Sequence, residues 1–410
     1  MSNMLGLSLL STLLLPVYGF ICLRFKWRFP SVYRLRDVLG LRGPKGTYQR
    51  WLHCASVGEV LAAKPLLDAW LGEGYKVFVT TYTPTGAQQL QRLFHGRVEH
   101  CYLPIDHPLF ISLWSRKLHF DILVLFEMEF WPVLLAYFSN SPKVVINARM
   151  SERSFRRYQK WPRLSRSVFA SFTRVLACTR VDAKRIAALG SPSVEVAGNI
   201  KFDVNVADAI EKPKFSLSGL KAWAAVSTHE GEEERILQVH QQLRRSLPEL
   251  VLILVPRHPE RFRKVEALAR QDFDYVMTRS QNTADQWSQA QVVIGDSMGE
   301  LLHYCSMAQV VFMGGSLIER GGHNPLEPAA LGKAVVSGTH TFNFELVYRE
   351  LSALDGVAVV ESTKELEEKL LVLLTNTAKA NKQGQIAQEY VRTHQGALGR
   401  VLQSIESMVK

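Results

Sequence analysis

Short apolar segments rich in valine and isoleucine alternate with helical patterns along most of this 410-residue chain, and this alternation most constrains the fold. Buried strands of parallel sheets, joined by helices, have this pattern. The segments of the first half are residues 49–53, 76–81, 122–126, 143–146, 174–177 and 194–197, and those of the second half are residues 222–226, 251–255, 291–294, 310–313 and 334–337. The sequence therefore predicts an α/β protein with two doubly wound sheets.

A polar stretch over residues 204–218 separates the two halves, and the chain is longer than one hydrophobic core usually organises. We expect an N-terminal segment of residues 1–28, a first domain of residues 29–208 and a second domain of residues 209–410. Two such sheets facing each other would leave a central cleft. The helical pattern from Lys364 onward could pack on its own domain or cross back to the first.

Residues 4–23 form a run of twenty uncharged, mostly apolar residues. A helix of this length spans about 30 Å, the thickness of the hydrocarbon layer. Because Arg24, Lys26 and Arg28 follow at once, the positive-inside rule places the rest of the chain in the cytoplasm. A signal peptide would carry its basic residues on the other side. We expect a single-pass anchor, although Pro16 also permits a helix that only enters the interface.

The chain carries 49 Lys and Arg residues against 38 Asp and Glu residues, a net charge of +11, which favours anionic partners. The densest positive region is residues 149–185. It has two acidic residues, Glu152 and Asp182, and contains Trp161. It fits a membrane surface or a phosphate-rich ligand, and a merely solvated face remains possible. No nucleic-acid-binding signature accompanies it. Its basic residues are Arg149, Arg153, Arg156, Arg157, Lys160, Arg163, Arg166, Arg174, Arg180, Lys184 and Arg185.

Metal binding has little support in the sequence. The five cysteines are scattered and form no C-x-x-C, which argues against a disulfide framework and a thiolate site. His229, His258 and His323 lack H-E-x-x-H or any other tight ligand spacing. We therefore expect no metal site.

Three glutamates follow strands of the first half. Glu59 ends the segment Ser56-Val57-Gly58-Glu59, where it could remove a proton from a bound hydroxyl or complete a capping box with Ser56. Glu127 and Glu129 follow a wholly apolar strand, where charge is costly unless it is paired or used. An ordinary cap for the helix after Pro132 is the alternative.

Polar, glycine-rich clusters of the second half lie after strands and before helices. Free N–H groups of glycine loops and helix starts suit a phosphate, and Arg257 could pair with it. Asn324 and Glu327 could hydrogen-bond a ribose or a base. No Walker loop and no G-x-G-x-x-G is present. The pattern indicates a nucleotide site, but neither NAD binding nor ATP-driven phosphoryl transfer.

Several long motifs in a fixed order resemble those of the 3-deoxy-D-manno-octulosonic acid (Kdo) transferases of lipopolysaccharide assembly. The resemblance extends from the N-terminus to about residue 350. This chain departs from the family pattern at three places. Met128 stands where the family usually has the Thr of Glu-Thr-Glu, and Val133 stands where it has the Asn of Trp-Pro-Asn. The segment Ser337-Gly338-Thr339 replaces a commoner Gly-Pro before His340. The motifs include Ser56-Val57-Gly58-Glu59, Thr83-Pro84-Thr85-Gly86, Asn147-Ala148-Arg149, Gly198-Asn199-Ile200-Lys201-Phe202-Asp203, Ser227-Thr228-His229-Glu230-Gly231-Glu232-Glu233, Val255-Pro256-Arg257-His258-Pro259-Glu260-Arg261-Phe262, Gly322-His323-Asn324-Pro325-Leu326-Glu327 and His340-Thr341-Phe342-Asn343-Phe344.

The resemblance implies an inverting, metal-independent glycosyltransferase of the GT-B arrangement, with two Rossmann-like domains. It implies CMP-Kdo as donor, the 6′-hydroxyl of the tetraacylated lipid A precursor as acceptor, and a place at the cytoplasmic side of the bacterial inner membrane, where anionic lipid would attract the basic residues. Glu59 matches the family's proton acceptor, and Glu127 and Lys201 match residues assigned to transition-state stabilisation. The residues that match CMP-binding segments are Pro256, Arg257, Met298, Gly299, Glu300, Asn324, Pro325, Leu326 and Glu327.

Two other classes remain as alternatives. A sugar-nucleotide epimerase could share the two-domain fold but would need neither an anchor nor a lipid-facing basic stretch. A non-catalytic membrane scaffold would explain the anchor and the charge, but not the many polar clusters at strand ends. No feature of the sequence specifies an oligomeric state.

Overall fold

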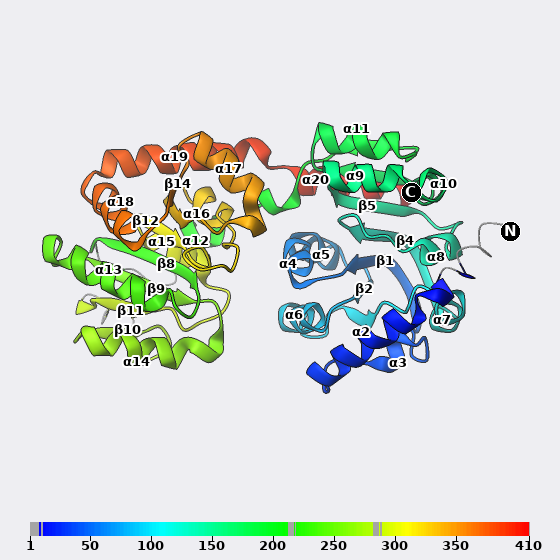
Figure 1. Ribbon diagram of the computed structural model, residues 1–410, viewed down its shortest axis with the longest axis horizontal. Coiled ribbons are helices and arrows are strands. Elements are labelled where there is room, and N and C mark those ends of the chain that lie inside the picture. Colours follow the sequence, from blue (N-terminus) through cyan, green and yellow to red (C-terminus); the bar gives the residue numbers. More distant parts are fainter. Residues whose placement is uncertain are drawn as a thin grey trace. The chain divides into compact units, whose positions relative to one another are not determined.

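A computed structural model describes residues 8–409, apart from residues 10, 212–216, 218, 282–286 and 288. It divides into two compact units (Figure 1). The first unit is Met1–Asp203 with Gln395–Lys410, and the second is Val204–His394. The expected boundary after residue 208 falls within helix α12 (Ala207–Glu211), five residues later than the division in the structure. The central cleft expected between two domains stays a prediction.

The first unit contains a parallel seven-stranded sheet in the order β3-β2-β1-β4-β5-β6-β7. The strands are β1 (Gly46–Cys54), β2 (Val77–Thr81), β3 (Glu99–Tyr102), β4 (Leu118–Phe126), β5 (Lys143–Ala148), β6 (Arg174–Ala177) and β7 (Val194–Val196). The helices are α2 (Leu15–Arg28), α3 (Leu35–Val38), α4 (Val57–Ala62), α5 (Lys64–Gly72), α6 (Pro84–Phe94), α7 (Pro108–Trp114), α8 (Pro132–Tyr137), α9 (Glu152–Gln159), α10 (Pro162–Phe169), α11 (Arg180–Ala188), the 3₁₀ turn η1 (Ile200–Phe202) and α20 (Ala397–Val409).

Helices cover both faces of the first sheet, because successive strand residues point to opposite faces. Leu123 and Leu125 of β4 pack with residues of α7, α8, α10 and α11. Val124 packs on the other face with residues of α4, α5, α6 and α20. Burial on both faces explains why the central strands read as continuous apolar runs in the sequence.

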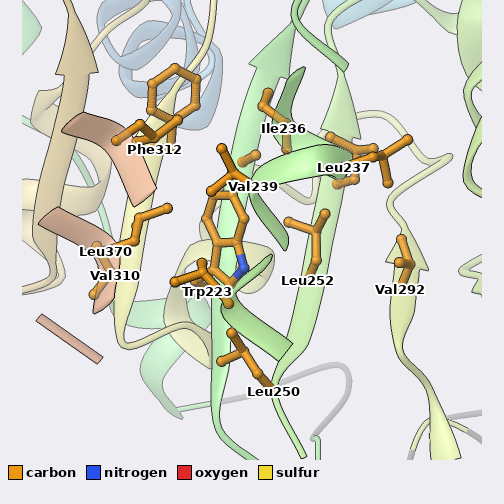
Figure 2. Packing of buried hydrophobic residues seen from close by; sticks show 14 of the residues in the cluster. Trp223, Ile236, Leu237, Val239, Leu250, Leu252, Val292, Val310, Phe312 and Leu370 are labelled. Carbon is orange, nitrogen blue, oxygen red and sulfur yellow. The ribbon is translucent and has the colours of Figure 1, made fainter. Parts of the chain in front are cut away.

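The second unit contains another parallel seven-stranded sheet, in the order β10-β11-β9-β8-β12-β13-β14. Trp223 lies in its core among Val239, Leu252 and Val310 (Figure 2). The strands are β8 (Ala222–Thr228), β9 (Val251–Pro256), β10 (Val276–Thr278), β11 (Val292–Ile294), β12 (Val310–Met313), β13 (Ala334–Gly338) and β14 (Val357–Val360). The helices and 3₁₀ turns are α12, α13 (Glu233–Ser246), η2 (Pro259–Arg261), α14 (Phe262–Asp272), α15 (Leu301–Met307), α16 (Leu326–Ala330), η4 (Phe342–Phe344), α17 (Glu345–Ala353), α18 (Thr363–Thr375) and α19 (Thr377–His394).

The last helix, α20, crosses back to the first unit, which is one of the two placements that the sequence left open. Its residues Ala397, Val401 and Ile405 are fully buried in the core of that unit. Glu406 pairs with Arg50 of β1, with an Nη2 to Oε1 distance of 2.6 Å. The chain therefore ends as part of the unit in which it began.

The N-terminal helix α2 does not match the single-pass anchor expected over residues 4–23. In the described part of the chain, no helix has the length and apolar character needed to cross a membrane. Helix α2 begins at Leu15 and continues past residue 23 to Arg28, and its Cys22 is buried against Tyr33. The anchor is thus not supported; residues 4–7 and 10 of that segment lie outside the described residues.

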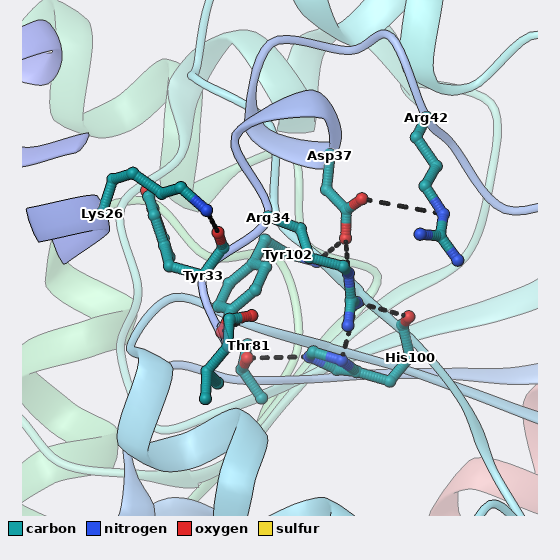
Figure 3. A network of polar contacts seen from close by, with 9 residues as sticks. Lys26, Tyr33, Arg34, Asp37, Arg42, Thr81, His100 and Tyr102 are labelled. Carbon is teal, nitrogen blue, oxygen red and sulfur yellow. Dashed lines mark hydrogen bonds and ion pairs between the residues drawn. The ribbon is translucent and has the colours of Figure 1, made fainter. Parts of the chain in front are cut away.

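A network of polar contacts follows α2 and fixes the next segment on the sheet (Figure 3). The fully buried carboxylate of Asp37 accepts a hydrogen bond from Arg34 at 2.7 Å, and the Arg42 guanidinium lies 3.9 Å from it. Arg34 also donates to the backbone carbonyl of His100 at 2.9 Å, and the His100 ring lies 2.9 Å from the Thr81 hydroxyl. These contacts join the segment after α2 to strands β2 and β3.

Candidate active site

Glu59 lies just beyond the carboxyl end of β1, in the first turn of α4, and is 9% exposed. Its Oε2 accepts the Ala55 N–H at 2.7 Å, and its Oε1 accepts the Ser56 hydroxyl at 2.8 Å. The Ser56 side chain makes no capping bond to the helix backbone, so the expected capping box does not form in its usual geometry. Burial raises the pKa of the Glu59 carboxyl, and the hydrogen bonds from Ser56 and Ala55 offset part of that rise.

Glu127 follows β4 and pairs with Lys201 of η1, at an Nζ to Oε1 distance of 3.3 Å. Its backbone has a φ of +62°, in the left-handed region that side chains other than glycine rarely adopt. Such strain persists only where surrounding contacts hold it, and it is concentrated at functional sites. Sequence positions 74 residues apart thus meet as a half-buried ion pair.

Glu129 is the third carboxylate at this end of the first sheet. Burial, together with the charges of Glu59 and Glu127, raises its pKa to about 7. Glu127 in turn raises the pKa of Glu59, whereas the ammonium of Lys201 lowers it. Three carboxylates and one cation therefore share a site in which the Glu59 carboxyl is a stronger base than an ordinary glutamate.

The predicted nucleotide-binding residues of the second unit lie at the carboxyl ends of its strands. Pro256 ends β9, and the Arg257 N–H that follows donates to the Thr228 carbonyl at 3.0 Å. Burial, offset in part by the positive charge of Arg257, raises the pKa of Glu327 to about 7. Asn324 Oδ1 accepts the Leu326 N–H at 3.2 Å at the start of α16.

The segment Met298-Gly299-Glu300 precedes α15. Met298 is 55% exposed, and Gly299 has a φ of +81°. Glu300 is buried and pairs with Arg279, at an Nε to Oε2 distance of 3.1 Å. Of these three residues, Glu300 is thus held by an internal ion pair, and Met298 presents an exposed side chain.

The glycine-rich loop after β12 is occupied by a carboxylate of the chain itself. Glu232 is fully buried; its Oε2 accepts the N–H of Gly315 at 2.7 Å, and its Oε1 accepts those of Ser316 and Leu317, each at 3.0 Å. It also accepts the His229 N–H at 3.1 Å. These loop N–H groups, which the sequence suggested for a phosphate, already have an anionic partner.

Histidines distant in sequence meet beside this loop. The Nε2 atoms of His229 and His323 lie 2.8 Å apart, and their rings are nearly parallel, at 5°. His258 packs edge-on against His229, with ring centroids 5.2 Å apart. Burial, together with nearby positive charge, lowers the pKa of His229 to about 4 and that of His323 to about 3. Within the described residues, no cluster of three or more His, Cys, Asp or Glu side chains could hold a metal ion.

Comparison with known proteins identifies the family. A family model described as 3-deoxy-D-manno-octulosonic-acid transferase (kdotransferase) matches residues 33–204. The 3-deoxy-D-manno-octulosonic acid transferase of Haemophilus influenzae is 36% identical over 392 residues, which are 92% of this chain and 91% of that protein. This chain belongs to the Kdo transferase family. The transferase of the same name from Bordetella pertussis is 31% identical, over 87% of this chain and 86% of that protein.

Solved structures similar to this Kdo transferase agree on the fold. The UDP-GlcNAc 2-epimerase of Neisseria meningitidis superposes with a TM-score of 0.56 at 14% identity, over 88% of this chain and 100% of that chain. At that identity the likeness establishes a two-domain α/β fold and nothing about the reaction. The resemblance drawn from the motifs is thus confirmed at the level of family and enzyme class.

The raised pKa of Glu59 predicts the pH dependence of this transferase. Glu59 is the predicted proton acceptor, and only its ionised carboxylate could take a proton. On that prediction, kcat/KM is expected to fall as pH decreases through a value above that of an ordinary glutamate. Lys201→Met removes a cation that lowers this pKa, and the acid limb should therefore move to higher pH. The pH profiles of kcat/KM for the wild type and for Lys201→Met measure the shift. An acid limb at the same pH in both would contradict the electrostatic coupling of Lys201 to Glu59.

Proposed function

We propose that this Kdo transferase moves Kdo from CMP-Kdo to the 6′-hydroxyl of the tetraacylated lipid A precursor, with inversion at C2 and without a metal ion. The observation that carries the proposal is the carboxylate of Glu59, which is buried at the end of β1, raised in pKa and electrostatically coupled to Glu127 and Lys201. Such a group suits the removal of a proton from a hydroxyl near neutral pH.

In the proposed step, the acceptor oxygen forms a bond to C2 of Kdo while the bond from C2 to the phosphate oxygen of CMP breaks. Glu59 takes the hydroxyl proton, and CMP leaves with the electron pair of the broken bond. C2 gains positive character in the transition state, where Glu127 and Lys201 offset developing charge. General-base assistance of this kind contributes about 10²–10⁴-fold.

The donor is assigned to the second unit. Arg257 offers a fork of donors to the CMP phosphate, and Asn324 and Glu327 offer hydrogen-bonding groups to the ribose or base. The proximity of Arg257 and Glu327 supports a joint role at this site. With the Gly315 N–H already bonded to Glu232, the phosphate contact is assigned to Arg257 rather than to the glycine-rich loop.

The acceptor and the membrane are assigned to the first unit, at the cytoplasmic face of the bacterial inner membrane. Exposed apolar side chains on α2 include Phe20, Leu23 and Trp27, which are 68%, 67% and 85% exposed. Arg157 and Arg163, on α9 and α10, are exposed and suit the phosphates of the acceptor and anionic lipid. These features favour a helix that lies in the interface.

The test is a mass-spectrometric assay with the lipid A precursor and CMP-Kdo in detergent. The expected product is an acceptor heavier by one or more Kdo residues. If the folded protein binds CMP but forms no such product, the proposed acceptor is wrong. Analysis of the released sugar separates transfer from the epimerase alternative, because an epimerase returns an isomerised sugar nucleotide. The absence of saturable CMP binding would favour the scaffold alternative.

The same assay tests metal independence. We expect the initial rate to be unchanged by EDTA, because Lys201 and Arg257 supply the positive charge that a metal ion would otherwise provide. The rate in excess EDTA, with and without added Mg²⁺, measures this directly. A loss of activity that Mg²⁺ restores would overturn the proposal of a metal-free step.

A further inference from the structure

Asn147 lies near the carboxyl end of β5 and has an unusual backbone conformation. Its φ is +54°, in the left-handed region, and its side chain is 1% exposed. The pairing of β5 with β6 shifts register between Val145 and Ala148, so an irregularity of the ladder contains this residue. Such irregularities re-aim a side chain next to an active site, and asparagine tolerates a left-handed backbone better than most residues.

The side-chain amide of Asn147 contacts Glu127 and the turn that carries Lys201. Its Oδ1 accepts the N–H of Ile200 at 3.1 Å, at the start of the 3₁₀ turn that carries Lys201. Its Nδ2 lies 3.5 Å from Oε1 of Glu127, the same oxygen that the Lys201 ammonium approaches to 3.3 Å. One buried amide thus joins the turn with the cation to the residue with the carboxylate.

We propose that Asn147 is a positioning residue that fixes the geometry of the Glu127–Lys201 pair, and this inference rests on the function proposed above for that pair. The Ile200 N–H requires an acceptor, and the Glu127 carboxylate requires a donor. A side-chain amide offers both groups at fixed spacing. An aspartate in its place accepts from Ile200 but directs a second negative oxygen at Glu127.

The arrangement also explains how Lys201 keeps one orientation. The Lys201 N–H donates to Asn199 Oδ1 at 3.0 Å, which fixes the turn from its own side. Asn147 fixes the same turn to the end of the sheet. A misplacement of about 1 Å costs on the order of a hundredfold in rate. The loss of the hydrogen bond from the Ile200 N–H to Asn147 should therefore reduce turnover.

The test compares Asn147→Asp with Asn147→Gly, whose backbone accepts a φ of +54° without strain. We expect kcat to fall between about ten- and a hundredfold in both variants, with the KM for CMP-Kdo little changed. Asn147→Asp alone should also move the acid limb of the pH profile to higher pH, since its added charge opposes ionisation of Glu59. Asn147→Gly adds no charge, so a fall in its kcat at unchanged KM, in folded protein, measures the loss of positioning itself.

Asn205→Asp is the matched control, because Asn205 also accepts a backbone N–H, that of Ala207, but from an exposed position. It adds the same charge and should leave kcat unchanged. If Asn147→Asp does not fold, Asn147→Gly decides, and a kcat within about threefold of wild type in a folded variant overturns the inference. Glu127→Gln and Lys201→Met are measured beside it: normal activity in these two refutes instead the role proposed above for the pair.

Discussion

Glu59→Gln is expected to fold, to bind CMP and to turn over at least about a hundredfold more slowly than the wild type. The amide has nearly the shape of the carboxylate, so its oxygen can still accept the Ala55 N–H that Oε2 accepts at 2.7 Å in the wild type. The amide cannot take a proton at working pH. The loss should therefore appear in kcat, with little change in the affinity for CMP, because the predicted CMP-binding residues belong to the second unit.

Two controls separate the base from its surroundings. Glu73→Gln makes the same change at an exposed position and should leave activity unchanged. Ser56→Ala removes a hydrogen bond that lowers the pKa of Glu59, so its acid limb should move to higher pH while a substantial rate remains. Single-turnover kinetics with product detection by mass spectrometry resolves these cases. Near-normal turnover by Glu59→Gln would remove the proposed base.

The central strands of both sheets could be predicted from the sequence, and the strands that were missed lie at sheet edges. Strands β3, β10 and β14 end their sheets, and each is three or four residues long. β3 reads Glu-His-Cys-Tyr, with only its last two residues buried. β3 therefore lacks the continuous apolar run by which buried strands are recognised, whereas β14 is apolar throughout but only four residues long.

The positions of the catalytic candidates were also predictable, because loops after parallel strands gather at one edge of a sheet. The contacts of these residues were not. Glu59 bonds to Ala55 instead of forming the capping box that its spacing with Ser56 suggested. The meeting of Glu127 with Lys201 depends on β4 and η1 being brought together by the fold. No local pattern carries that information.

The N-terminus shows the opposite case, in which a strong local signal was overridden by packing. The apolar run of residues 4–23 matched a membrane span by length alone. In the structure, Cys22 and Tyr18 of α2 pack against the first unit, while Phe20 and Trp27 are exposed. Part of the apolar character therefore serves the contact with the protein itself, which composition cannot distinguish from contact with lipid.

Glu232→Ala is expected to destabilise the second unit by at least about 3 kcal/mol, because several buried backbone donors lose their acceptor. Its carboxylate accepts four backbone N–H groups, from His229 and from the loop 315–317. Alanine leaves these donors without an acceptor in a site that excludes water, and each buried unsatisfied donor costs about 1–3 kcal/mol. The total stability of a domain is only about 5–15 kcal/mol, so the change should be large.

Glu232→Gln should lie between the alanine variant and the wild type, because its amide retains one accepting oxygen but directs N–H groups at two of the four donors. Glu368→Gln, at an exposed position on α18, is the control and should unfold like the wild type. Urea unfolding of the full chain, followed by the fluorescence of its tryptophans, yields the transition of each unit, since a two-unit protein need not unfold in one step. We expect the highest urea midpoint for the wild type, a lower one for Glu232→Gln and the lowest for Glu232→Ala. Equal midpoints for all three would mean that the loop 315–317 is held by packing and that Glu232 contributes no net stability through these hydrogen bonds.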